Sequence, residues 1–282
     1  MTMRVNQPHR RRRTHRYSQR MLGLSVLELL VGLAIGMLVV IAGLSALLAV
    51  RGVSGTVSEA NALQLQASYA LRIIGQQIRQ VGGRMLQPAD DPMAFAVFDE
   101  HPGLRSYLPL QGKETLASND FALEVLYQNT AEKSLPLLNN QPQLQPLLRD
   151  CLGEMVDPSS TPVVMSRFRR EGQQLVCAGS GLPQVLISGV EDFQVRYLLQ
   201  TAATNSPAAW RYVRADQIST AAQWRQVHAV EVCLELVGTE FIDTAGAEYT
   251  RCDQSTAARN NRLRMVFRNT FFISNRIWAS AS

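Results

Sequence analysis

The chain has 282 residues, of which 46% are hydrophobic and 18% charged, a composition that excludes a wholly disordered protein and can supply a buried core. Its formal charge of +5 is unevenly placed, because seven arginines and no acidic residue fall within residues 1–23. The rest of the chain holds 21 basic and 23 acidic residues. The basic balance therefore describes a short leader and not a nucleic-acid-binding domain.

Residues 24–50 form one apolar run that contains a single charge, Glu28. As a helix this run reaches about 40 Å, which exceeds the roughly 30 Å of hydrocarbon in a bilayer. A secretory signal peptide would need an apolar region of only about 7–15 residues. We therefore expect a membrane-spanning helix, with the arginines in the cytoplasm and everything after Val50 on the far side, which is the periplasm of a Gram-negative cell.

Glu28 is the unusual residue of this run, because an ionised carboxylate in hydrocarbon costs on the order of 2.5–3.5 kcal/mol. Two interpretations are open. Glu28 either sits near the lipid headgroups, or it pairs with a positive group on another subunit.

The stretch from Gly23 to Val31 (GLSVLELLV), preceded by basic residues and followed by apolar ones, resembles the class III signal of type IV prepilins and pseudopilins. The resemblance implies that a prepilin peptidase cleaves between Gly23 and Leu24 and that the new amine of Leu24 is methylated. It also implies that Glu28 neutralises the N-terminal amine of a neighbouring subunit in a filament. Two features depart from the usual pattern: Leu24 stands where many members have Phe or Met, and the leader is longer than in the commoner subtype.

The helical pattern continues over residues 51–82 and ends at Gly82-Gly83. Apolar residues recur at spacings of three and four, which predicts one packed face: Val53, Val57, Ala60, Ala67, Leu71, Ile74, Ile78 and Val81. The opposite, solvent-facing side is expected to carry Glu59, Asn61, Gln66, Arg72, Gln76 and Arg79. The expected organisation is a removed leader (1–23), a membrane half (24–50) and an amphipathic half (51–82) of one helix, and a globular head (83–282).

After residue 83 the pattern changes to short alternating runs separated by Pro, Gly, Asn and Asp, which is typical of strands and long loops. Strands are predicted at 121–127, 193–197, 228–237 and 263–268, the last continuing into Phe271-Phe272. Loops are predicted over 83–120, 128–162 and 200–226. The expected fold class is α+β, type IV pilin-like, with a long N-terminal helix packed on an antiparallel sheet.

All four cysteines (Cys151, Cys177, Cys233 and Cys252) fall on the exported side, where an even count favours two disulfides. Three pairings are open. We prefer Cys151–Cys177 with Cys233–Cys252, because each closes a local loop. A zinc site that combines cysteine with His101 or His228 is the alternative.

The sequence offers little catalytic chemistry, because neither His101 nor His228 belongs to a nucleophile or metal-binding motif. We expect no enzyme activity, no cofactor and no metal. The sequence also contains two clusters of arginine. We interpret both as ordinary solvated surface, and the alternative is a patch that binds DNA or an acidic partner. The clusters are Arg167, Arg169 and Arg170, and Arg259, Arg262, Arg264, Arg268 and Arg276. Four aromatic residues are expected in core or interface packing: Trp210, Tyr212, Trp224 and Trp278.

Two further stretches, residues 186–197 (LISGVEDFQVRY) and 261–270 (NRLRMVFRNT), resemble strands of PilW-type minor pilins. This resemblance implies a subunit that initiates or caps a type IV pilus near its tip and supports motility, adhesion or DNA uptake. Its partners would be the other minor pilins, the major pilin and the prepilin peptidase. It would reside in the inner membrane with one pass, its head in the periplasm, and then in the pilus. The alternatives are a J-type minor pseudopilin of type II secretion and a membrane-anchored periplasmic enzyme.

Overall fold

The computed structural model describes residues 25–83, 108–117, 120–134, 143–157, 160–203 and 206–274. The chain divides into two compact units between Ser54 and Gly55. Helix α1 (Val26–Gln80) contributes its first half to one unit and its second half to the other. The second unit, which contains all the strands, is called the head below.

In the first unit, α1 begins directly after Ser25, whose hydroxyl accepts a hydrogen bond from the amide of Leu27 at 3.2 Å. The segment Val26–Leu47 is long and apolar enough to span a membrane, with a mean hydropathy of 2.5. None of its side chains is buried in the structure. A single apolar helix near the N-terminus fits a membrane-anchored protein.

In the head, α1 buries one face against the sheets, as the spacing of its apolar residues predicts. The residues buried on this face are Leu63, Ala67, Ala70, Ile74, Ile78 and Val81. The expected stripe is wrong at its start, because Val57 is 53% exposed. The helix ends at Gln80 and is followed by Gly82, whose φ of +62° suits glycine and whose amide donates to the carbonyl of Leu126 at 3.1 Å.

One antiparallel sheet has the strand order β1-β2-β5-β6-β7. Its strands are β1 (Leu110–Gln111), β2 (Leu123–Gln128), β5 (Val163–Glu171), β6 (Gln174–Ala178) and β7 (Gln184–Ser188). A separate hairpin, β3 (Ala131–Ser134) and β4 (Gln143–Pro146), lies within the region expected to be loop.

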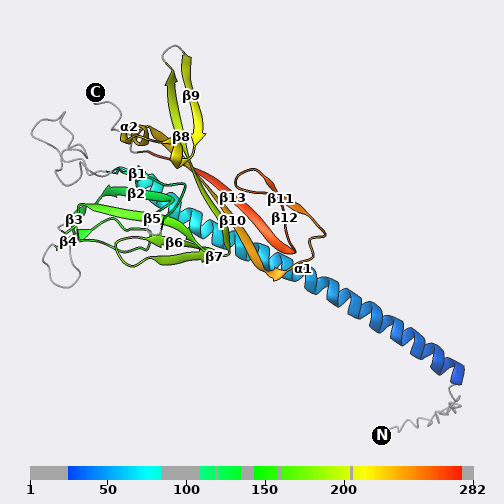
Figure 1. Cartoon of the computed structure of the whole chain (residues 1–282). Coiled ribbons are helices and arrows are strands. Elements are labelled where there is room, and N and C mark those ends of the chain that lie inside the picture. Colours follow the sequence, from blue (N-terminus) through cyan, green and yellow to red (C-terminus); the bar gives the residue numbers. More distant parts are fainter. Residues whose placement is uncertain are drawn as a thin grey trace, which may run out of the picture. The chain divides into compact units, whose positions relative to one another are not determined.

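The other antiparallel sheet has the order β13-β10-β8-β9. Its strands are β8 (Val190–Ala203), β9 (Ser206–Val213), β10 (Val227–Phe241) and β13 (Arg262–Phe272). Strands β10 and β13 run alongside the head part of α1 (Figure 1). Gly75 of the helix permits close approach here, because a Cβ atom at this position would lie 2.3 Å from the ring of Phe271.

Three short elements complete the head. The hairpin β11 (Glu248–Thr250) and β12 (Thr256–Ala258) follows β10, and η1 (Ala215–Gln217) and α2 (Ala221–Arg225) connect β9 to β10. The predicted loop over 200–226 is therefore wrong, since strand β9 and both short helices lie in it. Its Ala-, Ser- and Pro-containing start masks a strand that forms by pairing with β8.

The architecture confirms the expected α+β class: an N-terminal helix is followed by antiparallel sheets, and one core joins the head part of α1 to both sheets. The alternation predicted for 228–237 is confirmed on its apolar side, because Val230, Val232, Leu234 and Leu236 are fully buried. The other side is covered as well. Glu235, which the alternation places on the face opposite these four residues, has no exposed surface.

Cysteines pair as preferred from the sequence, Cys151 with Cys177 and Cys233 with Cys252. The Cα atoms are 6.4 Å and 5.8 Å apart, respectively, within the usual range for a disulfide. The second bridge ties the segment after β11 to strand β10. With all four cysteines in bridges, the zinc alternative loses its thiolate ligands.

Candidate functional site

Glu28 lies in the first turn of α1, on the exposed apolar segment. It makes no ion pair within the part of the chain that the structure describes. The helix N-terminus offers its carboxylate a favourable dipole, worth about 0.3–1 kcal/mol at an exposed site, which is less than the cost of burying the charge in hydrocarbon. Gly23 and Leu24, the predicted cleavage and methylation site, lie outside the described residues.

Three glycines share one helix face with Glu28: Gly32, Gly36 and Gly43. At 3.6 residues per turn, the four residues fall within an arc of about 80°. A Cβ atom added at any of these glycines would meet nothing within 4 Å in the isolated chain. Small residues on one face of a membrane helix allow a second helix to approach closely.

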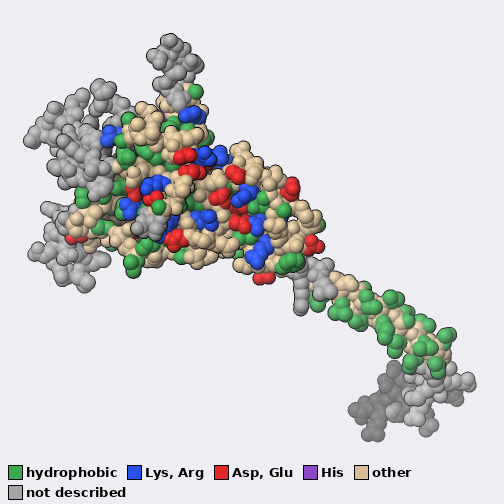
Figure 2. Space-filling model, viewed as in Figure 1, with side chains coloured by type: hydrophobic (Ala, Val, Ile, Leu, Met, Phe, Trp, Pro, Cys, Tyr) green, Lys and Arg blue, Asp and Glu red, His purple; other side chains and the backbone are tan. Residues whose placement is uncertain are grey.

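The two halves of the molecule differ in surface chemistry (Figure 2). Hydrophobic side chains cover the N-terminal part of α1, whereas the visible face of the head mixes Lys and Arg with Asp and Glu. An acid within an exposed apolar helix needs a compensating partner, and the described residues do not supply one for Glu28. This helix face is therefore the candidate functional site.

The head carries a second unusual acid, Glu59, which was expected on the solvent side of α1 and is 8% exposed. Its Oε1 accepts a hydrogen bond from the amide of Glu240 at 2.7 Å. Its Oε2 is buried and has no hydrogen-bond partner among the described residues. The register of β10 and β13 shifts between Val237 and Phe241, which frees the amide that Glu59 binds. Gly238 makes the room, since a Cβ atom there would lie 2.3 Å from Cδ of Glu59.

Two arginines of the C-terminal basic cluster lie on β13 and are paired within the chain. Arg264 pairs with Glu191, and Arg268 pairs with Glu231 at 3.3 Å and donates to the carbonyl of Cys252 at 2.9 Å. Burial lowers the pKa of Arg264 from its usual range. Arg276 lies outside the described residues. These pairs fit the interpretation as ordinary surface better than the alternative of a patch for DNA phosphates.

The other basic cluster lies on β5. Arg167 pairs with Glu124 on the neighbouring strand, and Arg169 pairs with Glu171. Both guanidinium groups also lie over the ring of Phe121, at 4.9 and 5.2 Å from its centroid. This cluster too is occupied by partners within the head.

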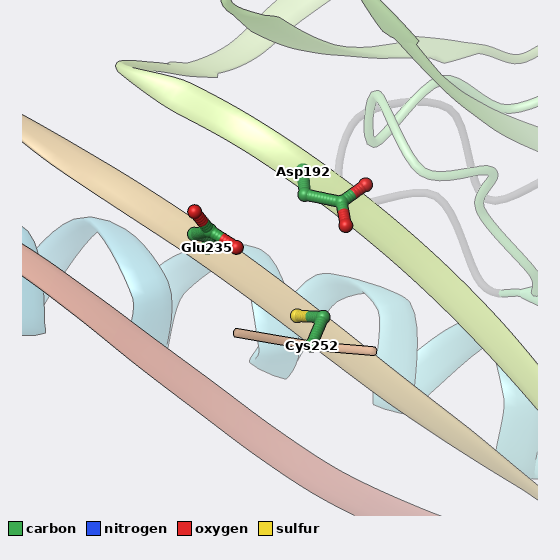
Figure 3. Close-up of side chains that lie close together, drawn as sticks. All are labelled: Asp192, Glu235 and Cys252. Atoms are coloured by element: carbon green, nitrogen blue, oxygen red, sulfur yellow. The ribbon is translucent and has the colours of Figure 1, made fainter. Parts of the chain in front are cut away.

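The described residues contain one group whose side-chain types could suit a metal ion, Asp192, Glu235 and Cys252 (Figure 3). The set does not fit a metal site. Cys252 is bonded to Cys233 and offers no thiolate, and Glu235 is already bound by other side chains.

Those partners of Glu235 come from the β11–β12 hairpin. The hydroxyl of Tyr249 donates to Oε1, and the guanidinium of Arg251 pairs with Oε2 at 3.4 Å. Burial, with the hydrogen bond to Glu235, raises the pKa of Tyr249 to about 12. Coulombic attraction to Glu235 raises the pKa of Arg251. The hairpin therefore compensates the buried carboxylate and covers this side of β10.

The aromatic expectations are met in part. Trp224 is buried and packs edge-on against Tyr197 with ring centroids 4.7 Å apart, as core packing requires. Trp210 is 50% exposed and stands edge-on to His228 at 4.2 Å, and Tyr212 is 43% exposed. Trp278 and His101 lie outside the described residues.

Sequence reasoning missed a buried polar network at the C-terminal end of α1. Oε1 of Gln77 accepts hydrogen bonds from the hydroxyls of Tyr127 and Ser166, both at 2.8 Å. Tyr127 also lies 2.6 Å from the carbonyl of Arg149. Burial raises the pKa of Tyr127 above its usual range. The only signal in the sequence was a glutamine next to the apolar stripe, which does not identify its partners.

Residues 158–275 match the family model described as Type IV Pilus-assembly protein W. This match covers less than half of the chain and confirms the resemblance to PilW-type minor pilins found in the sequence. It supports a pilus-related function and, with the apolar N-terminal helix, fits a membrane-anchored pilin.

Among solved structures, the chain is similar to a type IV-like pilin, TTHA1219 from Thermus thermophilus, with 14% sequence identity and a TM-score of 0.39. The similarity covers 76% of this chain and 96% of that protein. No curated protein matches the chain.

Proposed function

We propose that the chain is a minor pilin of the type IV pilus, which initiates or caps assembly near the tip. The observation that carries the proposal is Glu28, a carboxylate with no ion pair among the described residues, in the first turn of an exposed helix of membrane length. After cleavage between Gly23 and Leu24, a neighbouring subunit offers a positively charged N-terminal amine to this carboxylate. An ion pair inside a helix bundle removes the cost of leaving the acid alone in an apolar environment.

The glycine face supports the same proposal. Gly32 and Gly36 follow Glu28 at intervals of four residues, so the helix that brings the amine to Glu28 can lie close along this face. The structural role needs no catalytic group. We therefore propose that the head acts by contact and not by chemistry.

The most direct test is the mass of the N-terminus of the mature protein purified from its own cells. We expect a polypeptide that begins at Leu24 with one methyl group on its amine. Replacing Gly23 with Leu should block processing. A mature protein that keeps its arginine-rich leader would overturn the proposal in favour of an uncleaved anchor, as a periplasmic enzyme would have.

The charge pairing is tested by Glu28→Gln and Glu28→Asp. The amide removes the charge but keeps the size, so we expect processed protein in the membrane and little in sheared pili. Aspartate keeps the charge and should retain part of the assembly. Asp216→Asn is the control, because this exposed acid pairs with Arg214, a neighbour on the head surface. Normal piliation by Glu28→Gln would show that the carboxylate is not required.

The glycine face is tested by Gly36→Leu, which places a bulky side chain beside the expected neighbouring helix. We expect normal processing and reduced assembly. Ala34→Leu adds a leucine on the opposite face of the helix and should assemble better than Gly36→Leu. Equal assembly by the two variants would argue against close packing on this face.

A deletion strain separates the pilus from type II secretion. Loss of surface pili and twitching with normal release of exoproteins supports the minor pilin. The reverse result identifies a minor pseudopilin.

A further inference from the structure

The head contains an open cleft of about 510 Å³ between the C-terminal end of α1 and the segment 147–153. Its lining includes Tyr69 and Ile73 of the helix and Leu147 and Leu148 of the segment. Tyr69 and Leu147 are each about half exposed, at 50% and 51%. Leu65, one turn before Tyr69, is 72% exposed and extends the apolar surface beyond the cleft.

The lining of the cleft is mixed, because Gln76, Arg79 and Asp150 also belong to it. Positive charge borders its apolar part. Arg149 lies in its lining, and Arg72 lies one helical turn from both Tyr69 and Gln76. Neither arginine forms an ion pair with a carboxylate of the described residues. A fitting occupant therefore presents an apolar side chain flanked by acids.

The wall of the cleft is held in place before any partner arrives. The carbonyl of Arg149 lies 2.6 Å from the hydroxyl of Tyr127, and Cys151 is tied to Cys177. Asp150 accepts hydrogen bonds from the amides of Leu152, Glu154 and Ser180. A preformed surface loses less entropy when it binds.

The same chain presents such an occupant at the end of β10, in the segment 240–243, called the acidic tip. Phe241 is 78% exposed, and Glu240 and Asp243, both exposed, flank it. Arg262 lies opposite Phe241 on β13. Its positive charge offsets one of the two acids, so the tip keeps a net negative charge. An exposed phenylalanine between two acids complements the apolar part of the cleft, near which Arg72 and Arg149 lie.

The acidic tip is also held in place. The amide of Glu240 donates to Glu59 at 2.7 Å, and the amide of Ile242 donates to the carbonyl of Asn261 at 2.9 Å. The side chain of Asp243 accepts from the amide of Ala245 at 2.9 Å. Phe241 therefore projects from a fixed backbone.

We infer that the cleft binds the acidic tip of a second copy of this chain, with Phe241 inserted beside Tyr69 and Leu147. The tip is anchored at Glu59, and the cleft begins ten residues later on the same helix, a rise of about 15 Å. One chain cannot fill its own cleft over this distance with the backbone as described. Two copies displaced along the helix axis bring the two surfaces together.

This contact joins two different surfaces, so each copy keeps one of them free for the next copy. Such a heterologous contact extends into a row unless the rotation closes a ring. The inference concerns two copies of the chain alone and does not require the proposed role at the pilus tip.

The test uses the full chain in detergent with two introduced cysteines that leave Phe241 and Leu147 in place, and a short bis-maleimide that leaves the native disulfides intact. The cysteines are Thr239→Cys, exposed next to the tip, and Gln76→Cys, exposed in the cleft lining. We expect a ladder of dimers, trimers and larger products, because each copy carries both reactive surfaces. Either cysteine alone should give at most dimers. The control combines Thr239→Cys with Leu182→Cys, which replaces a leucine that is 83% exposed and lies outside the cleft.

Charge reversal provides the second measurement. Arg72→Glu in the doubly substituted chain should lower cross-linking about tenfold, a change equivalent to ~1.4 kcal/mol, and Asp243→Arg in the same chain should restore it. Equal ladders from the Gln76→Cys and Leu182→Cys chains would overturn the inference, as would monomers in both. Insensitivity of the ladder to Arg72→Glu would equally contradict the charge-complementary contact.

Discussion

The N-terminal half of α1 and the head both combine apolar side chains with an acid, but they differ in what surrounds these residues. Between Val26 and Leu47 the apolar side chains are exposed and the single acid, Glu28, has no described partner. In the head the apolar side chains are buried, and a fully buried acid, Glu235, is bound by Tyr249 and Arg251. A lone acid in an apolar setting is stable only when something compensates it.

The difference shows where each part finds its partners. The head satisfies its buried carboxylate at Glu235 through long-range contacts within the chain, so substitutions there should act on folding. Under the proposed function, Glu28 of the exposed helix finds its partner on another subunit, so substitutions there should act on assembly. The predictions below test this division by measuring unfolding of the full chain in detergent.

The largest effect is expected from the disulfides. Replacing Cys151 and Cys177 together with Ser should lower the unfolding free energy of the head by about 2–5 kcal/mol, because the bridge restricts the unfolded chain. Denaturant titration followed by tryptophan fluorescence measures this loss. N-terminal processing of the same variant should proceed as in the parent chain. A processing defect as large as the folding defect would break the division between the two halves.

Two glycines of α1, one at the start of the head and one against the sheet, should respond with opposite signs. Gly75→Ala is expected to cost about 1–3 kcal/mol, because its Cβ atom would lie 2.3 Å from the ring of Phe271. Gly55→Ala meets nothing within 4 Å and should stabilise the helix by up to about 1 kcal/mol. Thermal unfolding of the two variants measures the difference. Destabilisation by Gly55→Ala would reveal a contact of this helix face within the isolated chain.

Adjacent glutamines on α1 sharpen the comparison within the head. Gln77→Leu removes the acceptor of Tyr127 and Ser166 and should cost about 1–3 kcal/mol. Gln76→Leu, one position earlier and exposed, should change the unfolding free energy by less than about 0.5 kcal/mol. Similar losses in the two variants would mean that the buried network contributes nothing specific.

The smallest effect concerns pH. Because the folded head raises the pKa of Tyr249 from its usual value of 10.0 to about 12, the folded state holds this proton more tightly than the unfolded chain. The resulting stability is present below pH 10 and is lost between pH 10 and about 12. Tyr249→Phe should therefore lose less stability than the parent chain over this interval. If both chains lost the same unfolding free energy over this interval, the pH dependence would come from groups other than Tyr249, such as Tyr127 and Tyr197, which remain in both chains.

Local patterns in the sequence were sufficient to predict elements whose apolar residues repeat with the period of a strand or of a helix. The alternation from Val230 to Leu236 identified the central strand, and the spacing of Ala67, Ile74 and Ile78 identified the buried helix face. The short separations of the cysteines favoured the two bridges that the structure contains. These features depend on residues close together in the chain.

Features created by distant partners could not be read in this way. Glu59 was placed in solvent because helix periodicity carries no information about the free amide of Glu240, 181 residues later. Arg264 and Arg268 formed a basic stripe in sequence, whereas their partners lie on β8 and β10. Gly23 and Leu24 stay predictions, since they depend on recognition by a peptidase and not on folding.

The contact between Glu59 and β10 also bears on how the molecule would respond to a pull on its N-terminal helix. Tension that enters the head at Gly55 reaches this anchor within about one helical turn, ahead of the buried stripe that begins at Leu63. Strand β10 is 15 residues long, is bonded on both edges, and lies along the helix (Figure 1). A force along that axis would act in shear on many hydrogen bonds of the two ladders at once. The head should therefore resist extension more strongly than a domain in which an edge strand is pulled away one hydrogen bond at a time.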